Sequence, residues 1–189
     1  MKSVKHFPCA AWNYGKDQIE RVRKNHQLLN CDIELTRHCN LKCKFCYSSS
    51  GKPLDNELSL EQIKQVITDA KELGAKTITL TGGEPLMHPY FFEIVEFIRS
   101  KDMIVQMFSN GTFISPDFAK RLFVNNVYPC ISLESTNSDI HDNLAGVPGA
   151  YNKTTQGIKN LIEVGYTKEI PLTINAVITK FNYPNLQEL

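Results

Sequence analysis

Three cysteines fall within eight residues of this sequence, in the segment CNLKCKFC at 39–46. Their spacing is C-x3-C-x2-C, and the whole chain has six cysteines. In a reducing compartment, thiols grouped this closely are metal ligands or redox groups more often than disulfide partners. The question is which metal centre Cys39, Cys43 and Cys46 would hold without a fourth cysteine beside them.

Two kinds of metal centre compete for these cysteines. A structural zinc site needs four ligands, usually in pairs, and His38 is poorly placed as the fourth because it adjoins Cys39. Two-cluster and plant-type ferredoxins use other cysteine spacings. From these ligand rules we favour an iron–sulfur cluster over zinc by roughly two to one. Three thiolates on a four-iron cluster leave one iron open for a substrate or cofactor.

A second segment whose residues could take part in chemistry is TITLTGGEPLMHP at 77–89. There a predicted strand ends in Gly82, Gly83 and Glu84. Glycines let the backbone approach a ligand closely, and Glu84 offers a carboxylate to an ammonium group. Taken alone, this turn is also compatible with an ordinary strand end. The run SSSGKPLDNE at 48–57 reads as an ordinary exposed loop.

Alternating strands and helices must position these segments. Apolar or β-branched runs predict strands at 31–36, 75–83, 103–111, 128–135 and 170–179. Periodic apolar faces predict helices at 59–74, 90–100, 115–126 and 151–165, and the opening of another at 182–189. Ser59 and Gln62 can form a capping box, Gly74 stands at a helix end, and Ser115 precedes Pro116 as a cap. The alternation predicts an α/β fold with a parallel sheet, either a barrel or an open sheet.

Composition limits the function classes. The chain has 189 residues, 42% of them hydrophobic, and a formal net charge of +1. This length suits one domain, and the near-neutral balance argues against a nucleic-acid or membrane surface built on bulk charge. The sequence has no apolar run of membrane-spanning length and no long apolar stretch near its start. We therefore expect a cytoplasmic location, with no membrane or nucleic-acid partner.

The two motifs in this order resemble those of the radical S-adenosylmethionine (SAM) enzymes. The likeness continues through SNGT (109–112), SLES (132–135), HDNLAG (141–146) and TINAVITKFN (173–182). It covers residues 31–189 and is most similar to the branch that matures peptides or proteins. It implies a partial (β/α) barrel at 31–189, open or truncated, with five βα units of the usual six. A helical or irregular N-terminal segment would occupy residues 1–30.

The resemblance also implies the cofactors. Cys39, Cys43 and Cys46 would bind a 4Fe–4S cluster whose fourth iron is chelated by SAM. The implied SAM contacts are Phe45 at the adenine, Gly82, Gly83 and Glu84 at the methionine amino group, Ser132 and Glu134 near the ribose, and the strand-end residues Asn110 and Asn175. The implied activity is reductive cleavage of SAM to a 5′-deoxyadenosyl radical that abstracts hydrogen from a peptide or protein. The electron donor would be a flavodoxin or a ferredoxin.

The sequence departs from the family pattern at one charged position. Relatives that modify peptides often carry His-Asp-x-x-Arg after strand four, whereas here His141 and Asp142 are followed by Ala145. Either another group faces the SAM carboxylate or SAM binding is weaker. The alternative function is a truncated, cluster-binding fragment or binding module without turnover.

Several chemically reactive residues are expected to have ordinary roles. The remaining cysteines, which are Cys9, Cys31 and Cys130, should be buried or idle thiols. His88 and His141 should be surface or capping groups, and the basic residues within 16–24 should form a solvated helix face.

Overall fold

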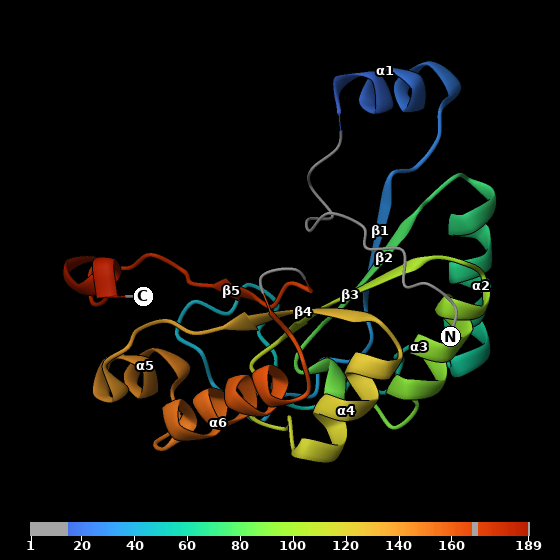
Figure 1. The fold of residues 1–189 in the computed structure, drawn as a ribbon. Coiled ribbons are helices and arrows are strands. Elements are labelled where there is room, and N and C mark those ends of the chain that lie inside the picture. Colours follow the sequence, from blue (N-terminus) through green and yellow to red (C-terminus); the bar gives the residue numbers. More distant parts are fainter. Residues whose placement is uncertain (1–14, 168–169, 189) are drawn as a thin grey trace.

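A computed structural model describes residues 15–167 and 170–188 of the chain. Within them, one sheet has five parallel strands in the order β1-β2-β3-β4-β5. The strands are β1 (Asn30–Glu34), β2 (Thr77–Thr81), β3 (Ile104–Ser109), β4 (Val127–Ser132) and β5 (Thr173–Asn175). β1 and β5 are the two edges, so the sheet is not closed. The sheet is curved (Figure 1). The predicted α/β fold with a partial parallel barrel is confirmed.

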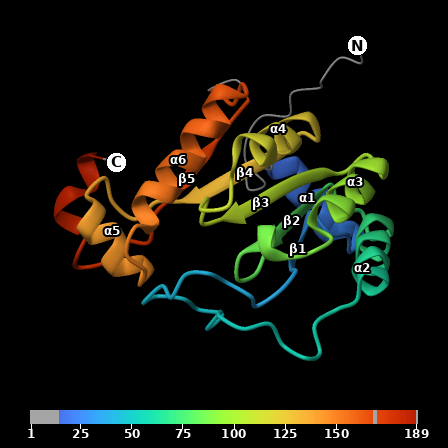
Figure 2. The same cartoon turned by 90° about the horizontal axis from the view of Figure 1, so that it is seen from below.

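Four helices pack along one face of this sheet, in the same order as the strands (Figures 1 and 2). They are α2 (Leu60–Glu72), α3 (Phe91–Ser100), α4 (Pro116–Val124) and α6 (Ala150–Glu163). A short helix, α5 (Ser138–Ala145), lies beyond the end of β4, and two 3-10 helices are η1 (Pro85–Met87) and η2 (Tyr183–Glu188). Helix α1 (Lys16–Asn25) stands apart from the sheet and has no buried residue, as expected of a solvated basic helix.

The helix ends follow the capping signals of the sequence. The Ser59 hydroxyl accepts the Gln62 N–H, and the Gln62 side chain accepts the Ser59 N–H at 2.8 Å, which completes the predicted capping box before α2. The Ser115 hydroxyl accepts the Phe118 N–H and caps α4. Gly74 follows α2 with a φ of +97°, a left-handed conformation that glycine adopts without steric cost.

The core lies between the sheet and this helix layer. Strand side chains such as Ile78, Leu80, Val105 and Met107 are completely buried. They form one cluster with helix residues that include Ile63, Ile67, Ile94, Ile98, Leu122 and Leu161. Full burial of one such side chain stabilises the fold by about 1.5–3 kcal/mol. This core fixes the strand ends that carry the polar residues described below.

The structure differs from the sequence prediction after β4. Strand β5 covers only Thr173–Asn175 rather than 170–179, because the Val177 N–H bonds to the Glu134 carboxylate instead of a neighbouring strand. The predicted final helix is the 3-10 helix η2. Helix α5 was not predicted, since its eight residues are too short to show a clear apolar period. The division into segments 1–30 and 31–189 stays a prediction, and Cys9 lies outside the described residues.

Candidate active site

The carboxyl ends of the five strands meet at one edge of the sheet, where a cavity of about 400 Å³ opens. In open parallel sheets and in barrels, this edge is where ligands bind. All the predicted site residues except Glu84 line this one cavity, namely Cys39, Cys43, Phe45, Cys46, Gly82, Gly83, Asn110, Ser132, Glu134 and Asn175. The fold therefore brings together residues from the ends of all five strands.

The cysteine loop runs from the end of β1 across to α5 (Figure 2). On the β1 side, the Arg37 guanidinium donates to the carbonyls of Ser48 and Ser49, both at 2.6 Å. On the α5 side, the N–H groups of Lys42 and Lys44 donate to the carbonyls at the end of α5, each at 2.9 Å. The loop is thus held at both ends by parts of the chain that are themselves packed.

The three thiols differ in their electrostatic environment. Burial raises the pKa of Cys43 to about 12, and the neighbouring thiols and the Glu134 carboxylate add to this effect. Burial also raises the pKa of Cys39. Partial burial acts in the same direction on Cys46, but hydrogen bonds from Ser48 and Ser50 outweigh it and lower the pKa of that thiol. Metal binding would therefore release protons, mainly from Cys39 and Cys43.

Two of the sulfur atoms already accept hydrogen bonds. Cys39 Sγ accepts the Leu41 N–H at 3.4 Å, and Cys46 Sγ accepts the Ser50 N–H at 3.4 Å. All three cysteines line the same cavity, as ligands of one iron–sulfur cluster would.

The glycines after β2 have a structural reason in addition to the expected approach to a ligand. A β-carbon on Gly82 would lie 2.4 Å from the Thr36 carbonyl oxygen, and one on Gly83 would lie 2.3 Å from that of His38. The N–H groups of Gly83 and Glu84 donate to these same two carbonyls at 2.7 and 2.8 Å. The turn therefore presses against the segment that leads into the cysteine loop. Close approach to the chain itself, as well as to the cavity, requires glycine here.

Glu84 is not among the residues that line the cavity. It is completely buried, and its Oε1 accepts the Ser109 hydroxyl at 2.8 Å and the Leu86 N–H at 3.2 Å. Its Oε2 accepts the Asn110 N–H at 2.8 Å. Both oxygens thus join the end of β2 to the end of β3. Acceptance of an ammonium group by this carboxylate stays a prediction, and the contacts favour a role in positioning β3.

The end of β4 carries a second buried carboxyl group. Glu134 is 2% exposed and lines the cavity, and its Oε2 accepts the Val177 N–H at 2.7 Å. Burial raises the pKa of Glu134 to about 7. Its Oε1 has no hydrogen-bond partner in the part of the chain that the structure describes. This oxygen is the one available to a ligand.

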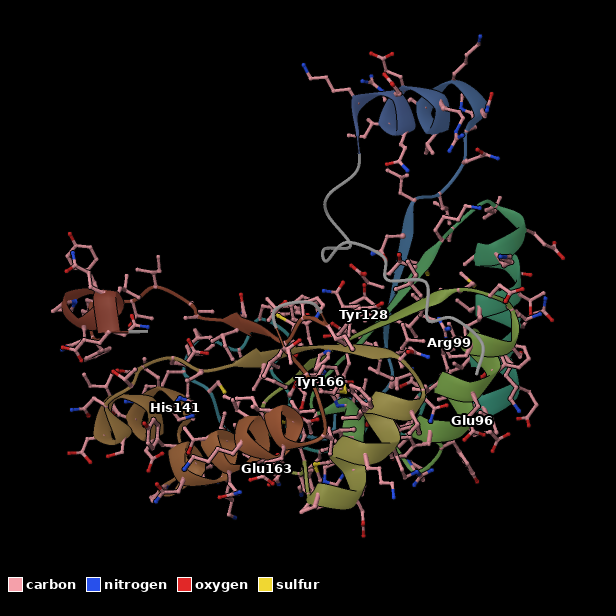
Figure 3. The ribbon with its side chains drawn as sticks, viewed as in Figure 1. Glu96, Arg99, Tyr128, His141, Glu163 and Tyr166 are labelled. Atoms are coloured by element: carbon pink, nitrogen blue, oxygen red, sulfur yellow. The ribbon has the colours of Figure 1, made fainter. Side chains whose placement is uncertain are left out.

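The sequence suggested that His141 is a surface or capping group, and the structure shows that it does not lie at the surface. It lies on α5 (Figure 3), is 2% exposed and lines the cavity. Its Nδ1 accepts the Glu134 N–H at 3.1 Å, and this bond places the proton of the neutral ring on Nε2, which has no partner among the described residues. Ala145 is buried against Leu41 and Ala150. Ala145 also lines the cavity, but its methyl group offers no charge to a ligand there.

The other expectations for reactive residues are met where the structure describes them. Cys130 is buried and Cys31 is half-buried, each in a strand. His88 follows η1, and its Nδ1 accepts the Tyr90 N–H, so it acts as a capping group. The segment 48–57 does more than expected, because Ser48 and Ser50 contact Cys46 and line the cavity. The serines and the glycine of this segment gave no sequence signal that it would contact a cysteine.

The comparison with protein families decides the classification. The family model described as the radical SAM superfamily matches residues 33–188. This chain belongs to the radical SAM superfamily. Membership implies SAM and an iron–sulfur cluster as cofactors, which agrees with the cysteine-lined cavity.

Relatives within this family are named for different functions. An AdoMet-dependent heme synthase from Nitratidesulfovibrio vulgaris is 32% identical over 158 residues, which cover 82% of this chain and 42% of that protein. The sporulation killing factor maturation protein SkfB from Bacillus subtilis is 37% identical over 148 residues, which cover 78% of this chain and 36% of that protein. The chain thus spans about two fifths of the length of such relatives.

The fold is also similar to a solved peptide-bound structure. Streptococcus suis SuiB, in complex with its precursor peptide SuiA, superposes with a TM-score of 0.73 at 22% identity, over 90% of this chain and 38% of SuiB. This likeness shows the shared fold.

Among the described residues, no helix has the length and apolar character needed to cross a bilayer.

Proposed function

We propose that this chain is the core of a radical SAM enzyme that holds a 4Fe–4S cluster on Cys39, Cys43 and Cys46 and binds SAM in the adjoining cavity. One observation carries the proposal: the three thiols and polar groups from the strand ends line the same cavity. When bound, the cluster and SAM supply an electron-driven cleavage that yields a 5′-deoxyadenosyl radical, which abstracts hydrogen from the substrate.

The residues of the chain would orient SAM along the strand ends. Phe45 lies between two cysteines and lines the cavity, which supports a contact between its backbone and the adenine. Gly82 and Gly83 line the same cavity and would contact the methionine end of SAM. Ser132 and the free Oε1 of Glu134 can accept ribose hydroxyl groups, which keeps the sugar at a fixed distance from the thiols.

No lysine or arginine is among the described residues that line the cavity. The carboxylate of SAM would therefore be held by the cluster and by neutral donors such as the side chain of Asn175. Hydrogen bonds from neutral donors are about half as strong as those from charged donors. We expect SAM to bind more weakly here than in relatives with an arginine at the position of Ala145.

The proposed substrate is a peptide or protein. Relatives that act in peptide maturation support this class, and so does the apolar surface beside β5, where Ile174, Val177 and Ile178 are 42%, 38% and 66% exposed. The proposed electron donor is a flavodoxin or ferredoxin. The proposed location is cytoplasmic, where the three cysteines would remain reduced and available to the cluster.

A second function, cluster binding without turnover, is favoured by one observation. Strand β5 is three residues long and pairs only with β4 among the described strands, so the cavity is open on that side. Water that enters there would weaken the electrostatic contacts with SAM.

Titration with SAM separates the two functions. The protein is reconstituted anaerobically with iron and sulfide, titrated with SAM, and then treated with a strong reductant. Formation of 5′-deoxyadenosine is the expected result. Tight SAM binding without 5′-deoxyadenosine would favour cluster binding without turnover, and a protein that assembles no cluster would contradict both functions.

A further inference from the structure

Three side chains beside the cysteine loop form a closed ring of hydrogen bonds. Asn110 Nδ2 donates to Asn40 Oδ1 at 3.0 Å, Asn40 Nδ2 donates to Thr112 Oγ1 at 2.9 Å, and the Thr112 hydroxyl donates to Asn110 Oδ1 at 2.6 Å. All three bonds run in the same direction around the ring. The Thr112 N–H also donates to Asn110 Oδ1 at 2.9 Å, and this bond determines which end of the Asn110 amide carries the nitrogen and hence the direction of the ring.

The ring joins the cysteine loop to the end of β3. Asn40 follows Cys39 directly, and Asn110 follows β3. The main chain of Asn110 is fixed as well, since its N–H donates to Glu84 Oε2 at 2.8 Å and its carbonyl accepts the Thr154 hydroxyl at 2.8 Å. Asn110 is thus held by four different residues, and its side chain has little freedom to turn.

The orientation of the ring leaves one hydrogen of the Asn110 amide for another acceptor. The first hydrogen of Nδ2 is used by Asn40, and Cys39 Sγ lies 3.9 Å from the same nitrogen. This contact is long for a hydrogen bond to a neutral thiol. Ionisation of Cys39 on metal binding would strengthen it, because charged acceptors form shorter and stronger hydrogen bonds.

We propose that Asn110 is a positioning residue for the cluster: its amide donates to the Cys39 thiolate and raises the reduction potential of the cluster. The inference rests on the proposed 4Fe–4S site. Hydrogen bonds to cysteine sulfur stabilise the additional negative charge of the reduced cluster, and are one of the means by which proteins tune cluster potentials. Glu84 and the ring with Asn40 and Thr112 hold the amide in place.

Two substitutions test this role from different sides. Asn110→Asp keeps the size of the side chain but replaces the donor by a negatively charged acceptor. Thr112→Val leaves Asn110 unchanged and opens the ring, and Thr112 does not line the cavity. Thr155→Val is the matched control, because the Thr155 hydroxyl bonds only to carbonyls within its own helix, α6.

The measurement is the midpoint potential of the reconstituted cluster, followed by electron paramagnetic resonance during a redox titration without SAM. We expect a negative shift in both variants, larger for Asn110→Asp, with full iron content and no shift in the control. An unchanged potential in both variants would overturn the inference. This also holds if SAM affinity fell at the same time, because Asn110 would then contact SAM directly. If Asn110→Asp did not fold, the shift in Thr112→Val would decide alone. A wild-type protein that assembles no four-iron cluster would overturn the proposed function itself.

Discussion

The backbone of Gly146 lies against the carbonyl group of Lys42, so closely that a β-carbon at position 146 would be 2.2 Å from the carbonyl oxygen. Gly146 ends α5 in the left-handed conformation, with a φ of 70°. Lys42 lies in the middle of the cysteine loop, immediately before Cys43. The short helix after β4 is therefore part of the support for the proposed metal ligands.

Substitution of Gly146 tests this support. Gly146→Ala should displace the loop and reduce the iron bound after reconstitution, because a β-carbon at this distance forces the backbone to move. Gly149→Ala is the matched control, since Gly149 has a similar φ of 78° but no atom within 4 Å of the added carbon. Left-handed backbone strain should cost each variant about 1–2 kcal/mol of stability, and Gly146→Ala should lose more because of its contact with Lys42. Equal iron content in the two variants would contradict the role of α5.

The Glu84 carboxylate offers a test of positioning against direct ligand binding. In Glu84→Gln, the amide nitrogen would face a group that now donates a hydrogen bond to the carboxylate, so that two donors would face each other. We expect the free energy of unfolding of the protein without cofactors to fall by about 1–3 kcal/mol. Chemical denaturation measures this loss. Glu96→Gln on the exposed surface of α3 (Figure 3) is the control and should change stability by less than about 0.5 kcal/mol.

The same Glu84 variant also distinguishes the alternative. If the carboxylate bound the SAM ammonium directly and had no positioning role, Glu84→Gln would keep the stability of the cofactor-free protein. It would lose SAM affinity alone, by on the order of 1.5–3 kcal/mol.

The raised pKa of Glu134 predicts that the stability of the protein depends on pH. Its pKa is raised to about 7 in the folded protein by burial, so the folded state binds the proton more tightly than the unfolded state. The stabilisation is present below the ordinary value of 4.5 and is lost as pH rises through about 7. Since one pKa unit corresponds to about 1.4 kcal/mol and water in the cavity screens the charge, we expect a loss on the order of 2 kcal/mol.

Denaturation of the cofactor-free protein at several pH values measures this effect. Glu134→Gln keeps an oxygen for the Val177 N–H and does not titrate, so its stability should fall less across this window than that of the wild type. Parallel pH profiles of the two proteins would show that Glu134 has no raised pKa.

Much of the fold could be predicted because the local signals agree with the packing. The Ser59–Gln62 capping box and the Ser115 cap lie where the sequence placed them, and both precede helices whose apolar faces are buried. The cysteines of the site were found from their spacing, and the SAM-contact residues were implied by the resemblance to the radical SAM enzymes. Both features depend on short stretches of sequence.

What could not be predicted depends on contacts between distant segments. Neither the buried position of His141 nor the ring of Asn40, Asn110 and Thr112 has a local signal. His141 contacts the end of β4 and Tyr151 of α6, and the ring needs the cysteine loop to meet the end of β3. The direction of the Glu84 side chain is of the same kind. A carboxylate after a glycine turn has no local signal for its partners, and the donors of Ser109 and Asn110 come from the end of the next strand.

The central claim is that Cys39, Cys43 and Cys46 bind a 4Fe–4S cluster. The most direct measurement is the iron content and the visible absorption spectrum after anaerobic reconstitution of the wild type, the three single Ala variants and the triple variant. The account predicts about four irons per wild-type chain and loss of the brown absorption in each variant. Cys31→Ala and Cys130→Ala should keep the cluster. Full iron content in the triple variant, or zinc in place of iron in the wild type, would contradict the account.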